Sequence, residues 1–419
     1  MRLWRSGAAV LSGLLISSSF AGLAAQTAGA ATAKKSTITI GYITDETGFA
    51  SSTFADGPGG AQARIAAQNA KGGVNGHPLK LVVEDDQSSP AANLTAAQDL
   101  VSNKHATVVI DYSSFAFGAI RYLQQQGVPV VGGAFDGPEW GQQPYTNMFS
   151  FALPSESPIN GTYFGYTYYG KFLKSIGVTK YAGLGYGISP SSQESIVAAQ
   201  TSAQKFGIKP CYLNQSVPFG GVDFTADVLQ IKNAGCDLVN GSFVDSSDVA
   251  LANAVKQAGI KAKQLYFTGY DEDILGSASA RAAFDGAYVS NLVNFTPPNK
   301  GTQGMLDTLK KYDPTYKGGI PDFGLYGSYL SADLAIRGLQ AAGANPTGAS
   351  FISGLRKVSS YNAGGILPAP VTFKGFATAA MFPKTACDYF EQLQGDKFVT
   401  VTGKPICGTR ITVKFSSGA

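Results

Sequence analysis

Serines and acidic residues at the ends of predicted strands are the first candidates for chemistry in this sequence. Ser113 and Ser114 follow the strand-like run ATVVIDY and stand where a helix is expected to begin. Free backbone N–H groups at a helix N-terminus suit a carboxylate or another anion. The same two serines could instead only cap the helix. Asp271 ends another predicted strand, where a carboxylate can pair with a ligand ammonium group.

Patterns that would indicate catalysis or a metal site are missing from the sequence. His77 stands in a turn and His105 follows a predicted helix, and neither belongs to an HExxH metal motif. There is no G-x-S-x-G nucleophile motif and no phosphate-binding GK[ST]. The adjacent acids Asp85-Asp86 and Asp271-Glu272-Asp273 cannot face each other across a cleft as glycosidase carboxylates do. We therefore expect no enzyme activity, no cofactor and no metal.

Length and charge limit the class of protein. The 419 residues include 32 Lys and Arg against 28 Asp and Glu, a formal net charge of +4. Removal of an N-terminal segment containing Arg2 and Arg5 would leave +4 − 2 = +2. That value is too close to neutral to favour nucleic acid or a membrane surface as a partner. The length predicts two domains, and the charged fraction of 14% is typical of a compact chain.

The first 33 residues have the features of a signal peptide. MRLWRSG is a short basic region, AAVLSGLLI is too short to span a bilayer, and small residues follow. Cleavage after Ala31-Thr32-Ala33 would start the mature chain near Lys34, with Ala28-Gly29-Ala30 as a second candidate site. A membrane anchor is the alternative. No cysteine precedes Cys211, so we expect no lipid-anchored cysteine and a soluble, exported protein, periplasmic or secreted.

Cysteine usage agrees with export. The chain has four cysteines, Cys211, Cys236, Cys387 and Cys407, and an even number suits an oxidising compartment. The sequence alone permits three pairings. Cys211–Cys236 and Cys387–Cys407 are favoured because each encloses a short loop, and buried free thiols are the alternative. None of the cysteines is spaced as CxxC, which argues against a zinc ribbon or a thioredoxin-like site.

Strands and helices alternate along the chain, which predicts parallel sheets covered by helices on both faces. The β-branched or apolar runs TITIGYIT, LKLVVEDD, ATVVIDY and VPVVGG are the first expected strands. The helix SPAANLTAAQDLVSN begins at Ser89-Pro90, an N-cap followed by proline. The pattern restarts near Pro158, with KYAGLGYG, CDLVNGSF and KQLYFTGY as strands. Such sheets bind ligands at the carboxyl ends of their strands, so facing loops should form a cleft.

A long stretch, NAKGGVNGHPLKLVVEDDQSSPAANLTAAQDLVSNKHATVVID, resembles the leucine/isoleucine/valine-binding protein family. These are type I periplasmic binding proteins that serve ABC importers. Further similar segments are GVPVVGGAFDGPEW, DFTADVLQIKNAGCDLV and QLYFTGYD, and the resemblance covers nearly all of residues 36–403. It implies an α/β fold of two doubly wound parallel-sheet lobes joined by a three-strand hinge. Lobe 1 would take residues 36–155 and 286–383, and lobe 2 would take residues 156–285 and 384–419.

The resemblance also implies ligand contacts in the first lobe. Phe54 aligns with an aromatic lid position, and Ser113 and Ser114 align with groups that bind a ligand carboxylate. Ala134 matches a position that uses its backbone carbonyl. Asp136 stands where the family has a hydroxyl residue, and it would repel an acidic ligand if it faced the cleft.

Four further contacts are implied in the second lobe. Asp271 aligns with the carboxylate that binds the ligand ammonium, while Tyr186, Ser189 and Phe243 hold aromatic or polar positions. The simplest ligand is then a small zwitterion with an apolar body, such as a branched or aromatic amino acid. A cationic or neutral amide-like ligand is favoured instead if Asp136 faces the cleft.

The function implied by the resemblance is that of an extracytoplasmic solute-binding protein. It would capture an amino acid or related compound in an interlobe cleft and deliver it to the membrane subunits of an ABC importer. We expect a monomer that closes around its ligand by a hinge motion. A ligand sensor that signals to a membrane receptor is the alternative function, and amides, polyamines and aromatic acids are alternative ligands.

Overall fold

The computed structural model describes residues 35–415. The predicted signal peptide lies outside the described residues, so its structure and cleavage stay predictions. Within the described range, no helix is both long and apolar enough to cross a membrane. The chain forms two sheets, each covered by helices on both faces, and this is the α/β architecture expected from the sequence.

Five parallel strands form the first sheet, in the order β2-β1-β3-β4-β5. Their bounds are β1 (Ile38–Thr44), β2 (Leu79–Asp85), β3 (Val108–Asp111), β4 (Val130–Gly132) and β5 (Met148–Ser150). The first four strands were predicted from their β-branched or apolar runs. Strands β1, β3 and β4 are almost completely buried, whereas β2 at the sheet edge is partly exposed. The three-residue strand β5 carries no such pattern and was missed.

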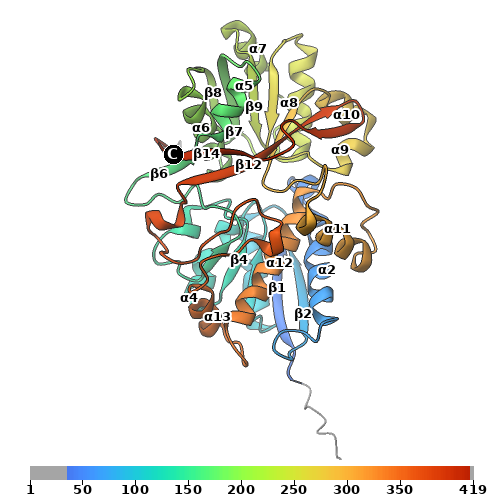
Figure 1. Ribbon diagram of the computed structural model, residues 1–419, viewed down its shortest axis with the longest axis vertical. Helices are drawn as coiled ribbons and strands as arrows, with labels where there is room; N and C mark the ends of the chain where they lie inside the picture. Colours follow the sequence, from blue (N-terminus) through green and yellow to red (C-terminus); the bar gives the residue numbers. More distant parts are fainter. Residues whose placement is uncertain (1–34, 416–419) are drawn as a thin grey trace, which may run out of the picture. The chain divides into compact units, whose positions relative to one another are not determined.

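Helices from distant parts of the sequence cover the first sheet. One face carries α2 (Gly57–Asn69) and α12 (Phe323–Ala341), and the other carries α3 (Pro90–Ser102) and α4 (Ile120–Gln125). Figure 1 shows α12, in orange, alongside α2, in blue. The two helices pack closely at Gly60, where a Cβ atom would collide with the backbone carbonyl of Leu325. Further helices on this side are α11 (Lys300–Tyr312) and α13 (Gly348–Leu355).

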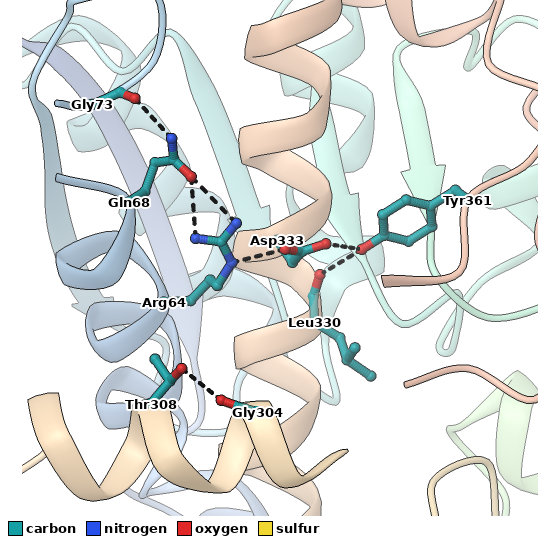
Figure 2. A network of polar contacts seen from close by, with 8 residues as sticks. All are labelled: Arg64, Gln68, Gly73, Gly304, Thr308, Leu330, Asp333 and Tyr361. Atoms are coloured by element: carbon teal, nitrogen blue, oxygen red, sulfur yellow. Dashed lines mark hydrogen bonds and ion pairs between the residues drawn. The ribbon is translucent and has the colours of Figure 1, made fainter. Parts of the chain in front are cut away.

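A polar network fixes α12 to α2 (Figure 2). Arg64 of α2 donates to Asp333 of α12 at 2.8 Å, and the hydroxyl of Tyr361 donates to the same carboxylate at 2.9 Å. The amide of Gln68 donates to the carbonyl of Gly73 at 2.7 Å and ties the end of α2 to the following turn. The network therefore joins three segments that lie far apart in the sequence.

The second sheet has the strand order β6-β14-β12-β11-β10-β9-β7-β8, with β13 paired to β12. The bounds are β6 (Tyr163–Tyr166), β7 (Lys180–Tyr186), β8 (Lys209–Val217), β9 (Leu238–Ser242), β10 (Lys263–Tyr266), β11 (Tyr288–Asn291), β12 (Thr385–Gln394), β13 (Lys397–Thr400) and β14 (Ile406–Val413). Strands β7 to β11 pair in parallel, whereas β12, β13, β14 and β6 pair antiparallel. The second sheet is therefore mixed, because the C-terminal segment returns as a hairpin.

Two helical layers cover the second sheet. One face carries α5 (Tyr168–Ser175) and α6 (Pro190–Gln204). The other face carries α7 (Thr225–Ala234), α8 (Asp245–Gln257) and α10 (Ala278–Phe284). Two short helices, α1 (Ser51–Phe54) and α9 (Glu272–Gly276), follow strands β1 and β10.

Three chain segments run between the two sheets, after β5, after β11 and before β12. The exact division into lobes stays a proposal. Strand β11 pairs with β10 and β12 in the second sheet. The segment up to Asn291 therefore belongs with the second sheet, and the proposed return of the chain to lobe 1 follows Asn291 instead of beginning at residue 286.

Both favoured disulfides are present. Cys387 and Cys407 lie opposite each other on β12 and β14, with Cα atoms 4.0 Å apart. Cys211 of β8 bonds Cys236, with Cα atoms 5.8 Å apart, although β8 and β9 are not neighbours in the sheet. Cys236 reaches Cys211 because it precedes β9, at the end of α7, which packs on β8.

Candidate functional site

A cavity of about 280 Å³ lies where strands of both sheets end. Its lining comes from the segments that follow β1, β3, β4 and β5 of the first sheet and β7, β9, β10 and β11 of the second. Tyr169 of α5, Phe219 after β8, the start of α12 and Asp388 of β12 complete the wall. The carboxyl ends of parallel strands are the expected place for a ligand in this architecture.

Seven of the nine residues predicted to contact ligand line this cavity. They are Phe54, Ser114, Ala134, Asp136, Tyr186, Ser189 and Phe243. Ser113 and Asp271 are not among the lining residues, and the structure gives each of them another role.

Ser113 is completely buried beneath the loop that follows β3. Its hydroxyl donates to Asp86 and accepts from the backbone N–H of Phe115, so it holds the loop in shape. The backbone N–H of Ser114 is also engaged, because it donates to the carboxylate of Asp45 at 2.8 Å. Acidic side chains therefore lie behind the expected anion site. Burial, and then repulsion from Asp86, raises the pKa of Asp45 and of Asp111. This arrangement is poorly suited to a ligand carboxylate.

Asp271 lies outside the cavity, although the sequence places it at the end of a strand. Its carboxylate accepts from the backbone N–H of Ile274 at 2.8 Å and caps helix α9. It lines a separate hollow together with Asp56, Asp273 and Asp322. The structure thus does not bring Asp271 together with the other predicted contacts.

Asp136 faces the cavity, which answers the question that the sequence left open. Its Oδ1 accepts from the hydroxyl of Ser189 at 2.5 Å, across from the second sheet. Burial raises the pKa of Asp136 to about 7. The loop adopts positive φ values of 56° at Ala134 and 60° at Asp136, a backbone region that L-residues rarely occupy. This backbone conformation orients the Asp136 side chain toward the cavity.

A second cross-sheet contact lies beside the cavity. The hydroxyl of Thr53, on α1, donates to Asp245 at 2.7 Å and accepts from the backbone N–H of Asp245 at 2.9 Å. Both side chains are buried, and burial raises the pKa of Asp245 to about 6. Thr53 follows a strand of the first sheet and Asp245 follows a strand of the second, so this contact ties the two sheets together.

Aromatic rings line the cavity from both sheets. On the first-sheet side, Phe54, Tyr112, Phe135 and Phe323 lie with ring centroids 5.0 to 5.8 Å apart. On the other side, Tyr186 lies 4.8 Å from Phe219 and 4.6 Å from Phe243. Rings at such separations make a firm apolar surface that can enclose the body of a ligand.

Sequence reasoning missed several lining residues. Phe135 stands beside Asp136 in the quoted loop, so its position offered a local signal. Phe323 and Tyr326 lie at the start of α12. Phe323 is 187 residues beyond Asp136 in the sequence, and no local pattern marks either residue as a ligand contact. Two acids, Glu156 and Asp388, were also missed. Among residues 35–415, no group of three His, Cys, Asp or Glu side chains is arranged to hold a metal ion.

Comparison with known proteins agrees with this architecture. A family model described as periplasmic binding protein matches residues 37–386. The Leu/Ile/Val-binding protein homolog 2 of Brucella abortus is 23% identical over 290 residues, which cover 68% of this chain and 73% of the relative. Homolog 1 of the same species is 22% identical over the same shares.

Solved structures share the fold at low sequence identity. Streptococcus pneumoniae LivJ, a branched-chain amino acid transporter substrate binding protein in complex with isoleucine, has a TM-score of 0.68 and 16% identity over 88% of this chain and 99% of its own. An R. palustris ABC transporter solute binding protein in complex with benzoate has a TM-score of 0.70 and 16% identity, covering 90% and 97%. The fatty acid ABC transporter substrate-binding protein from Thermomonospora curvata has a TM-score of 0.71 and 16% identity, covering 87% and 91%. Because the family model spans most of the sequence and the fold agrees, this chain belongs to the periplasmic binding protein family.

Proposed function

We propose that this protein captures a small molecule outside the cytoplasm and delivers it to the membrane subunits of an ABC importer. The observation that carries the proposal is the cavity itself, which is walled by strand-end loops of both sheets. The contacts Asp136–Ser189 and Thr53–Asp245 join the two sides of that cavity. Separation of the sheets would break both contacts and open the cavity to solvent, as a capture-and-release protein requires.

The proposed location rests on the signal-peptide pattern and on the disulfides. Both disulfides need an oxidising compartment to form and persist. We propose that the mature chain starts near Lys34 and acts as a monomer. Light scattering of the purified exported protein tests the monomer, and a dimer at micromolar concentration would contradict it.

The proposed ligand contacts are the seven predicted residues that line the cavity, with Phe54 and Phe243 as apolar walls. Phe243→Ala should weaken ligand binding by at least tenfold, because the ring packs between Tyr186 and Phe224 and its removal opens a gap in the wall. Isothermal titration with a ligand found by thermal-shift screening measures this effect. Unchanged affinity in a folded variant would show that Phe243 does not contact the ligand.

Two experiments test the function as a whole. Small-angle scattering with and without a saturating ligand should give a smaller radius of gyration for the complex, because closure brings the sheets together. Reconstitution with a candidate ABC permease and ATPase should give ATP hydrolysis that rises when the liganded protein is added. Stimulation of a histidine kinase in place of an ATPase would support the sensor function and contradict import.

A further inference from the structure

A second cavity of about 230 Å³ lies directly beside the first one. The two cavities share part of their walls, including Phe151, Ser155, Tyr169, Leu292 and Asp388. The second cavity extends between α6, β6 and the segment that precedes β12. A ligand body longer than that of a small amino acid therefore has room to extend from one cavity into the next.

The charged residues along both cavities are all acidic. Asp136 and Glu156 line the first cavity, Glu194 lines the second, and Asp388 lines both. Each of the four is buried, with 2 to 7% of its surface exposed. Among the described residues that line the two cavities, none is Lys, Arg or His. A ligand in this space meets four carboxyl groups and no protein cation.

Two of these carboxyl groups lack a full set of hydrogen bonds. Asp136 accepts from Ser189 and Asp388 accepts from Ser290, each at 2.5 Å. In contrast, Glu156 Oε2 and Glu194 Oε1 are buried with no hydrogen-bond partner among residues 35–415. Burial of a carboxylate is strongly unfavourable unless a cation or several donors compensate it. The two glutamates are therefore the groups that a ligand cation would stabilise most.

The pKa directions agree with this geometry. Burial, then repulsion from Glu194 and from Asp136, raises the pKa of Glu156 well above its usual value. Burial raises the pKa of Glu194 to about 8 and that of Asp388 to about 7. Glu156 is therefore close enough to Glu194 and Asp136 for both to disfavour its charged form. One positive charge beside it would relieve both repulsions at once.

We propose that the ligand is an organic cation, an amine or guanidine with an apolar body, whose positive group binds at Glu156, near Asp136 and Glu194. The inference rests on the proposed function and specifies its substrate class. The aromatic walls serve the same ligand, because ring faces attract cations as well as apolar groups. A ligand carboxylate is disfavoured, since the N–H of Ser114 already binds Asp45 and no Lys or Arg faces the described part of the cavities.

The first test compares head groups on one apolar body. The mature protein is titrated with 2-phenylethylamine, 3-phenylpropionate and 3-phenylpropanamide at pH 6.5, and with the corresponding hexyl and decyl series. The amine of at least one series should bind about tenfold or more tightly than its acid and its amide, as expected for a charge-assisted contact. Tighter binding of the acids or amides throughout would overturn the cation inference and leave the proposed function standing. If no compound of the panel and no common amino acid binds, the result contradicts both the cation inference and the proposed function.

Proton release gives a readout that a purely apolar pocket would not produce. At pH 6.5 the carboxyl groups with raised pKa values hold protons, and a bound cation favours their ionised form. Binding of the amine should therefore release protons to the buffer, seen as an enthalpy that differs between phosphate and ACES, two buffers with different ionisation enthalpies that both work at this pH. Binding of the amide should show no such difference. Amine binding without proton release would contradict the assignment.

A matched pair of variants locates the cation. Glu156→Gln should weaken amine binding about tenfold or more and leave amide binding unchanged. Glu391→Gln is the control, because Glu391 on β12 is also buried, with both carboxyl oxygens unpartnered among the described residues, but lines neither cavity. Thermal melting verifies that both variants fold. Equal losses of amine affinity in the two variants, or no loss in Glu156→Gln, would overturn the proposal.

Discussion

The contact between Thr53 and Asp245 offers a sharp test of how the two sheets are held together. Thr53→Val keeps the branched shape and removes one hydroxyl, which both donates to the carboxylate at 2.7 Å and accepts from the N–H at 2.9 Å. In a form with separated sheets, water would make the hydrogen bonds to Asp245 that Thr53 makes here. The variant should therefore destabilise only the closed form.

The expected size follows from the two hydrogen bonds that are lost. A hydrogen bond to a charged group contributes about 1.5–3 kcal/mol and a neutral one about 1 kcal/mol. A combined loss of about 3 kcal/mol lowers the population of the closed form on the order of 100-fold relative to the open form. If tight binding requires closure, the observed dissociation constant rises by up to the same factor.

Titration calorimetry with a confirmed ligand measures the change, and scattering reports whether the complex still closes. Thr308→Val is a suitable control, because the Thr308 hydroxyl binds the Gly304 carbonyl of its own helix at 2.7 Å (Figure 2). It should bind ligand like the unmodified protein. Affinities within twofold of each other for Thr53→Val and Thr308→Val would refute the view that this contact stabilises the liganded form.

Three further predictions concern stability, the ligand ammonium and the thiols. The pKa of Glu194 is raised to about 8 and that of Asp388 to about 7, so each group stabilises the fold below about pH 4.5 and this contribution is lost as pH rises through 7 and 8. Urea titrations of ligand-free protein should show an unfolding free energy that falls from pH 5 to pH 8, and a rise would contradict these shifts. Asp271→Asn should change ligand affinity less than threefold, because it lies outside the cavity and asparagine also caps helices; a 30-fold loss would restore it as the ammonium partner. Mass spectrometry under non-reducing conditions should give a chain that starts near Lys34 and is four hydrogens lighter than the reduced one, and alkylation of native protein would exclude the two disulfides.

Local patterns in the sequence determined most of the secondary structure. The runs around Ile38 and Val108 predict buried strands because Ile and Val favour the extended backbone and both sheet faces are covered. The Gly-Gly-Val-Asn-Gly turn was also readable, since Gly73, Asn75 and Gly76 adopt positive φ values that suit glycine and asparagine. Short loops favoured one of the three possible cysteine pairings, and the structure contains both bonds of that pairing. Each of these features depends on residues that are close in the sequence.

The tertiary structure alone decided which side chains reach the cavity. Asp136 faces it and Asp271 does not, although both lie at or just after the end of a predicted strand, because a loop with positive φ values presents the first while the second caps α9. Glu156 and Glu194, each with one carboxyl oxygen that has no hydrogen-bond partner among residues 35–415, become neighbours only when the segment after β5 packs against α6, and no spacing in the sequence marks that meeting. The charge of the cavity, and hence the class of ligand proposed for it, is therefore a property of long-range packing. Burial and the separation between carboxyl groups set their electrostatics, and neither quantity can be read from the identity of the residues.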